Sequence, residues 1–148
     1  MWNAMIENDT IRLLRECDAG AAMGADSIKD VLDDVQDPAM RQLLRESGTA
    51  HADISGEIRA QLHRCGDAGK KPGPMAEAMS RAETWVKLKL DRSDRTIADL
   101  MTDGCNMGVK SLSRYLNQYA AADGPSRNAA ARLIRLEAQL AEDLRAYL

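Results

Sequence analysis

Four long stretches of this chain place apolar residues three or four positions apart, the spacing that lines one face of an α-helix. The first stretch sustains this spacing over about seven turns, through Leu14, Cys17, Ala21, Ala25, Ile28, Leu32 and Val35. No stretch alternates polar and apolar residues with the period of two that a half-buried strand requires. The sequence therefore predicts an all-α chain of long helices that pack along their apolar faces.

The residues between these stretches are of the kinds that begin and end helices. Asn8 or Asp9 can cap the first helix, and Asp37-Pro38 joins a capping side chain to a first-turn proline. Gly66 suits a left-handed helix end, and Asp123-Gly124-Pro125 repeats the cap-and-proline pattern. These signals predict one domain over 1–148 with helices at about residues 9–35, 38–65, 74–90, 94–122 and 125–147.

The lengths of the connections predict how the helices are arranged. The first and third links are tight, so each joins two helices into an antiparallel hairpin. The middle connection, residues 67–93, is long enough to contain the shorter helix and to carry the chain back along the bundle. This favours a ferritin-like up-down-down-up four-helix bundle with an additional short crossover helix. The alternative is an all-antiparallel bundle with the short helix laid across one end.

Composition excludes several classes of function. The 148 residues are 45% apolar and 29% charged, as in ordinary globular domains, and the net charge of −3 gives no electrostatic footprint for nucleic acid or an anionic membrane. Two Trp, three Tyr and no Phe argue against aromatic platforms for single-stranded nucleic acid. Three widely spaced cysteines and the absence of an apolar leader or membrane span favour a cytoplasmic protein with free thiols.

Counting residues from the turns places two ionisable side chains at one height in the bundle. With a rise of about 1.5 Å per residue, His51 and Glu137 share a layer if the second and fourth long helices are antiparallel. Both lie on the apolar stripes of their helices, and Gly24 and Gly108 fall near the same layer. Ferritin-like di-iron proteins place carboxylates and Glu-x-x-His pairs at this level.

Two segments look like halves of that Glu-x-x-His motif. Gly48-Thr49-Ala50-His51 has the histidine without the glutamate, and Glu137-Ala138-Gln139-Leu140 has the glutamate without the histidine. Two further segments are the crossover sequence Trp85-Val86-Lys87-Leu88-Lys89 and the sequence Cys105-Asn106-Met107-Gly108 ahead of Tyr115. Together with the helix lengths, these segments make the chain resemble the bacterial ferritin-like domains of unknown function. The resemblance implies a degenerate di-iron-type site.

A buried glutamate needs a partner, because an isolated buried carboxylate is costly or becomes protonated. Glu137 can pair with His51 as the relic of a metal site, or with another group such as Arg41. It can also belong to a retained site completed by Asp18 or Asp26, or lie in solvent if its helix is rotated. His51 itself is either a hydrogen-bonded core histidine or a ligand.

These alternatives lead to three hypotheses for function. The first is a non-enzymatic bundle with a structural or interaction role, in which self-association as a homo-oligomer is plausible and no cofactor is bound. The second is a redox or storage protein that holds iron or another divalent metal through His51, Glu137 and one or more of Asp18, Asp26 and Asp103. The third is a small-ligand-binding bundle. No catalytic residues are predicted, since no nucleophile stands in a recognisable grouping.

Glycines inside the predicted helices carry a cost of about 1 kcal/mol each relative to alanine. They stand in pairs four or eight residues apart: Gly20 and Gly24, Gly48 and Gly56, and Gly104 and Gly108. We interpret them as a sign of close approach between the first and third long helices, with Met23, Met101 and Met107 filling irregular gaps. The alternative is that they leave room for a ligand.

Overall fold

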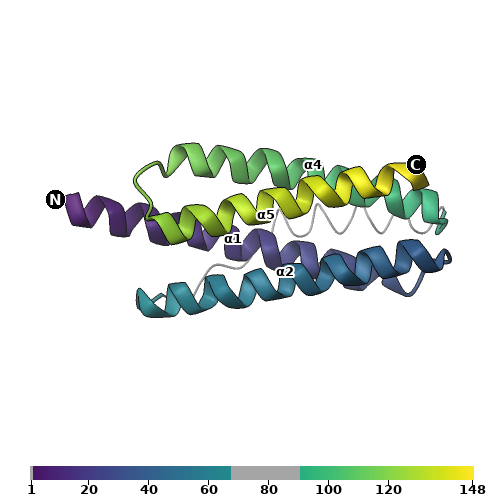
Figure 1. Cartoon of the computed structure of the whole chain (residues 1–148), viewed down its shortest axis with the longest axis horizontal. Helices are drawn as coiled ribbons and strands as arrows, with labels where there is room; N and C mark the ends of the chain where they lie inside the picture. Colours follow the sequence, from purple (N-terminus) through teal and green to yellow (C-terminus); the bar gives the residue numbers. More distant parts are fainter. Residues whose placement is uncertain (1, 68–90) are drawn as a thin grey trace.

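The computed structural model describes residues 2–67 and 91–148, and within these ranges it contains long helices and no strand. Helices α1 (Trp2–Leu32), α2 (Pro38–Arg64), α4 (Asp94–Gln118) and α5 (Gly124–Asp143) are followed by the 3-10 turn η1 (Leu144–Tyr147). The helices lie side by side in an elongated bundle (Figure 1). The prediction of an all-α chain of long helices is confirmed. The predicted helix at 74–90 lies outside the described residues.

Most of the predicted helix boundaries lie close to those observed, and α1 departs furthest from its prediction. It begins at Trp2 instead of near residue 9, so the prediction that Asn8 or Asp9 caps it is wrong. The Asp9 carboxylate accepts the backbone N–H of Ala121 at 3.0 Å, across the bundle. At the other end of the chain, α5 tightens into η1 for its last turn.

The predicted caps of α2 and α5 are confirmed. The Asp37 side chain accepts the Met40 N–H at 2.9 Å, and Asp123 accepts the Ser126 N–H at the same distance. A proline follows each of these aspartates within the first turn of its helix. Gly66 adopts a φ of 73° just beyond the end of α2, a conformation that favours glycine.

Contacts between helix ends fix the directions of the helices. At one end of the bundle the Asp94 carboxylate, at the start of α4, accepts the N–H groups of Gln36 and Asp37 at 2.8 and 2.9 Å, in the turn between α1 and α2. At the other end the Asp123 N–H donates to Thr10 at 2.8 Å, so the α4–α5 turn lies beside the early part of α1. Helices α1 and α5 therefore run one way and α2 and α4 the other (Figure 1), unlike the all-antiparallel alternative.

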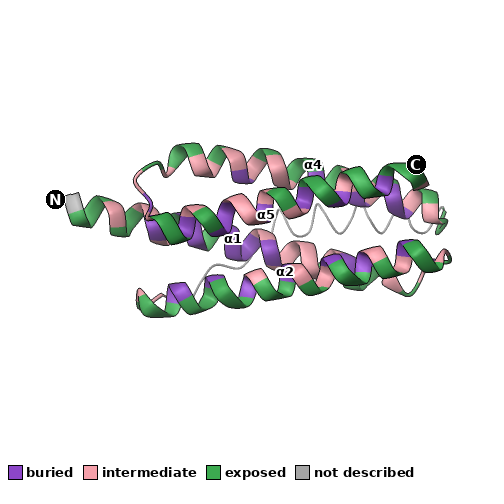
Figure 2. Cartoon of the chain, in the orientation of Figure 1, coloured by how far each residue is buried: buried purple, intermediate pink, exposed green. Residues whose placement is uncertain are grey.

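The buried residues form two separate apolar clusters along the length of the bundle. Buried positions lie on the facing sides of the helices, and exposed positions cover the outer surface (Figure 2). One cluster is formed by Ile28, Val31, Val35, Met40, Leu44, Ile97, Ala98, Met101, Cys105, Leu140 and Leu144. The other is formed by Leu13, Leu14, Cys17, Ala21, Ile58, Leu62, Leu112, Ala122, Ala129, Ala130 and Leu133. On every helix the two clusters leave a gap of one to several turns between them.

Among the described residues, no helix has a segment that is both long enough and apolar enough to cross a bilayer.

The double contact made by Asp94 predicts that its removal loosens the end of the bundle. We expect Asp94→Ala to lower the free energy of unfolding by about 1.5–3 kcal/mol, because two backbone donors lose a charged acceptor. Urea denaturation measures this change. Asp99→Ala removes an exposed carboxylate from the next part of α4 and serves as the control. Equal effects of the two substitutions would show that the Asp94 contacts contribute nothing specific.

Candidate functional site

A single polar layer separates the two apolar clusters. It is formed by one residue from each helix: Gly24 of α1, His51 of α2, Gly108 of α4 and Glu137 of α5. His51 and Glu137 are both buried, and they belong to helices that pack against each other. The sequence prediction that these two side chains share a layer with Gly24 and Gly108 is confirmed.

His51 uses both of its ring nitrogens within the protein. Its Nδ1 atom lies 2.8 Å from the carbonyl oxygen of Ser47, one helical turn earlier. A carbonyl oxygen can only accept, so we assign a proton to Nδ1. The Nε2 atom lies 2.6 Å from Oε1 of Glu137 and makes the contact between α2 and α5. A contact this short requires one proton between the two atoms, so the pair as a whole is neutral.

Gly24 provides the surface on which this pair lies. A Cβ atom at position 24 would lie 2.6 Å from Cδ2 and 2.8 Å from Nε2 of His51, and 3.2 Å from Oε1 of Glu137. Real Cβ atoms essentially never show the first two distances, so no larger residue fits without moving the ring. On the opposite side, a Cβ at Gly108 would be in ordinary contact with Cδ of Glu137 at 3.4 Å. The space beside both glycines is filled by the pair itself.

The remaining helical glycines divide into packed and open positions. A Cβ at Gly48 would lie 3.3 Å from Ile28, which supports close approach of α1 and α2. Gly56 and Gly104 face open space, so for them the prediction of close approach is wrong. Met107 was predicted to fill a gap in the core, but its side chain is 67% exposed, so this prediction is wrong. Helical spacing alone did not give the rotation of α4 about its axis.

The charges around the layer act on His51 from both sides. Burial lowers the pKa of His51, but the hydrogen bond and negative charge of Glu137, with the Ser47 carbonyl, outweigh it and raise the pKa above its ordinary value of 6.5. The contact with Glu137 therefore stabilises the protonated, imidazolium form of His51.

Cys105 of α4 is the third ionisable group at the layer. Burial raises the pKa of its thiol, and the charge of Glu137 and a hydrogen bond with that carboxylate raise it further. The thiol stays protonated at neutral pH, so it can act as a donor to Glu137. No site role was predicted for Cys105 or Ser47 from the sequence. The signals were present, since Cys105 lies three residues before Gly108 and Ser47 lies four residues before His51.

The other predicted metal ligands lie away from this layer. Asp18 is buried, but its carboxylate accepts from the Arg59 guanidinium at 3.0 Å, and it lies six residues before Gly24, roughly 9 Å along the helix. Asp26 and Asp103 are exposed. Across residues 2–67 and 91–148, no group of three or more His, Cys, Asp or Glu side chains is placed to hold a metal ion. These residues do not fit a di-iron centre.

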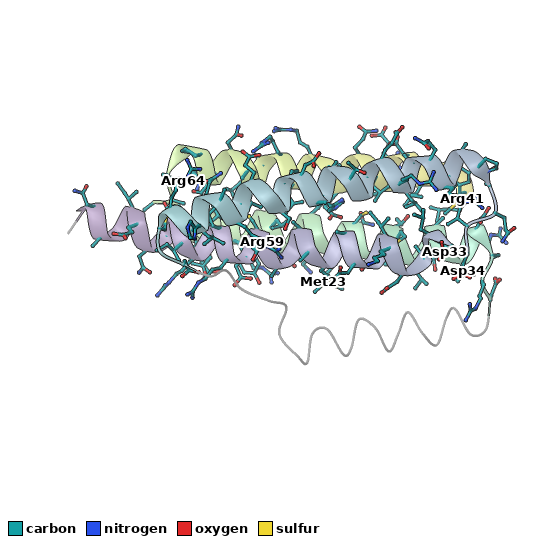
Figure 3. The ribbon with its side chains drawn as sticks, turned by 90° about the horizontal axis from the view of Figure 1, so that it is seen from below. Met23, Asp33, Asp34, Arg41, Arg59 and Arg64 are labelled. Atoms are coloured by element: carbon teal, nitrogen blue, oxygen red, sulfur yellow. The ribbon has the colours of Figure 1, made fainter. Side chains whose placement is uncertain are left out.

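Arg41, an alternative partner for Glu137, has a different role. It lies near the end of the bundle (Figure 3), and its guanidinium donates to the carbonyl oxygen of Val35 at 2.6 Å. It therefore holds the α1–α2 turn, and the ion pair with Glu137 is made by His51.

Comparisons with known proteins give no relative for this layer. No protein family model matches the chain, and neither the curated proteins nor the solved structures include a significant match. The ferritin-like resemblance therefore stays a prediction.

The contacts of Gly24 predict opposite effects for substitutions at two glycines. Gly24→Ala should lower stability by about 1–3 kcal/mol, because the new methyl group displaces the His51 ring. Gly56→Ala should raise stability by up to about 1 kcal/mol, since it adds helix propensity in open space. Denaturant midpoints measure both changes. A gain of stability in both variants would contradict the tight seating of the pair.

The raised pKa of His51 predicts that stability depends on pH. The stabilisation is complete below the unfolded-state pKa near 6.5 and is lost as pH rises through the higher folded-state pKa. We expect the free energy of unfolding to fall over that window, with a slope of up to about 1.4 kcal/mol per pH unit. Glu137→Gln should flatten this slope, because it removes the charge that raises the pKa. His63→Ala, at an exposed histidine, should leave it unchanged. A slope that persists in Glu137→Gln would rule out this pair as its source.

Proposed function

We propose that this chain is a non-enzymatic bundle of ferritin-like connectivity with a structural or protein-interaction role. In this proposal a closed ion pair, His51–Glu137, occupies the level at which ferritin-like bundles hold metal ligands. The helix directions and the long segment between α2 and α4 support the connectivity. The mid-bundle position of the pair supports the comparison with a metal layer.

One observation carries the proposal: the layer is chemically closed. Both ring nitrogens of His51 are engaged, one by Ser47 and the other by Glu137. A di-iron centre of this architecture draws about six ligands from all four helices. Here α1 and α4 contribute Gly24 and Gly108 where such ligands would have to stand.

The closed pair has a structural use that follows from the composition of the core. The two clusters are built almost entirely of aliphatic and small side chains, which can repack with little loss after a shift along the helix axis. Moving α2 by one turn against α5 would bury an unpaired imidazolium and an unpaired carboxylate, which costs about 3–5 kcal/mol. The pair thereby selects one register among several apolar alternatives.

A second candidate function is binding of a single divalent metal ion. His51 and Cys105 both contact the Glu137 carboxylate, so an imidazole and a thiol meet at one carboxylate. Among the described residues, however, no three such side chains are placed to hold a metal ion. The ion would have to replace the proton shared by the pair and the proton of the thiol. Burial raises the pKa of Cys105, which opposes the loss of that second proton. Because that proton is hard to remove, we favour the closed ion pair over a metal site.

The geometry gives less support to small-ligand binding. The interior space beside Gly24 and Gly108 is taken by the pair. Two open grooves lie on the outer surface of the described residues: one of about 260 Å³ between α2 and α5, and one of about 380 Å³ between the start of α1 and the end of α2. Ligand pockets typically enclose most of the ligand's surface. The first groove is lined by Leu43, Glu46, Ser47, Ala50, Leu136, Gln139, Leu140 and Asp143.

Elemental analysis of protein purified without chelators tests the proposal against its rival. We expect far less than one equivalent of any transition metal per chain, and no binding when Zn²⁺ or Co²⁺ is titrated in at neutral pH. His63→Ala controls for adventitious binding at the exposed histidine. One equivalent of metal that is retained in His63→Ala and lost in His51→Ala would overturn the ion-pair proposal in favour of the metal site.

A further inference from the structure

The first two turns of α1 extend beyond the rest of the bundle. The α4–α5 turn is held at Asp9 and Thr10, and Thr10 is buried whereas residues 3–9 are exposed or half-buried. Residues 2–8, which we call the overhang, therefore lie outside the four-helix part. Figures 1 and 3 show this helical end projecting past the neighbouring helices. Its length is roughly 10 Å at the rise of an α-helix.

The described side chains of the overhang include exposed apolar surface. Met5 is 55% exposed, one of the few large apolar side chains so exposed, and Ile6 beside it is only half-buried. Helical segments this short are marginal in water and gain most of their stability from packing. A partner that covers Met5 and Ile6 would supply that packing.

An open groove lies where the overhang meets the end of α2. Its volume is about 380 Å³, which gives room for an apolar side chain from outside. It is lined by Asn3, Ile6, Glu7, Thr10, Arg64, Cys65 and Asp123. Met5 does not line this groove, so in one copy the exposed apolar side chain and the groove are separate features.

The charges at this end of the molecule complement each other between two copies. Glu7 and Arg64 are both exposed and both line the groove, and neither forms an ion pair with a described residue. Arg64 is labelled in Figure 3 at the end of α2, near the base of the overhang. In a two-fold contact, any pairing of residue i on one copy with residue j on the other is repeated as j with i. A second copy can therefore meet each carboxylate with a guanidinium, and the contact is formed twice.

We infer that this end of the bundle is the contact surface for a second copy of the chain. In the resulting symmetric dimer, Met5 of each copy enters the groove of the other, beside Ile6. Glu7 of each copy pairs with Arg64 of the other copy. The inference does not depend on the buried His51–Glu137 pair, so its failure would leave the proposed function unaffected, and the converse also holds.

Light scattering coupled to size-exclusion chromatography, followed by sedimentation at several concentrations, tests the dimer with the full chain. The wild type should show twice the chain mass of 16.2 kDa. Met5→Glu should weaken the dimer by about tenfold or more, because it places a charge in an apolar contact. Met107→Glu makes the same change at a residue that is 67% exposed on α4 and should leave the dimer intact. Circular dichroism checks that each variant keeps the helical fold.

A charge reversal tests the proposed pairing itself. Glu7→Arg and Arg64→Glu should each weaken the dimer, and the double variant should regain most of the loss, because the pair is rebuilt with reversed signs. A monomeric wild type would overturn the inference. So would a Met5→Glu variant that remains fully dimeric, or a double variant no tighter than the single ones.

Discussion

The contact between the His51 ring and the Glu137 carboxylate determines how the helices pack at the middle of this bundle. It joins α2 to α5 at 2.6 Å, and the same ring is held to its own helix through the Ser47 carbonyl. The ring can occupy this place only because α1 offers a glycine, Gly24, beneath it. Each of these features has a cost in isolation: a buried histidine, a buried carboxylate and a glycine within a helix. Together they form one neutral, closely packed layer.

This layer accounts for the division of the core and for the function that we propose. On both sides of it the packing is aliphatic and tolerant of repacking, whereas the layer accepts only one alignment of α2 against α5. A metal centre at the same level would need open coordination positions and additional carboxylates. The structure instead has an imidazole with both ring nitrogens hydrogen-bonded and a protonated Cys105 thiol. Helices α1 and α4 each place a glycine at this level. The arrangement stabilises a scaffold better than it supports chemistry.

Much of the fold could be predicted from the sequence because its signals are local. Asp37-Pro38 begins a helix through its own side chain, and counting residues from that turn is enough to bring His51 and Glu137 to one height. The rest depends on contacts between distant segments. From the sequence, Asp18 is a candidate metal ligand, but in the folded chain its carboxylate is bound by Arg59, a residue of another helix. The role of Cys105 depends on how far α4 is rotated, which a three-to-four spacing leaves open by tens of degrees.

The protonation state of the His51 ring tests the account most directly, and nitrogen-resolved NMR of the imidazole measures it. We predict that both ring nitrogens still carry protons when the pH exceeds 6.5, the ordinary pKa of histidine. We also predict that Nε2 shows a strong hydrogen bond and that added divalent metal leaves both nitrogen signals unchanged. An unprotonated Nε2 at neutral pH, or ring signals that move with one equivalent of metal, would contradict a closed ion pair at the centre of the bundle.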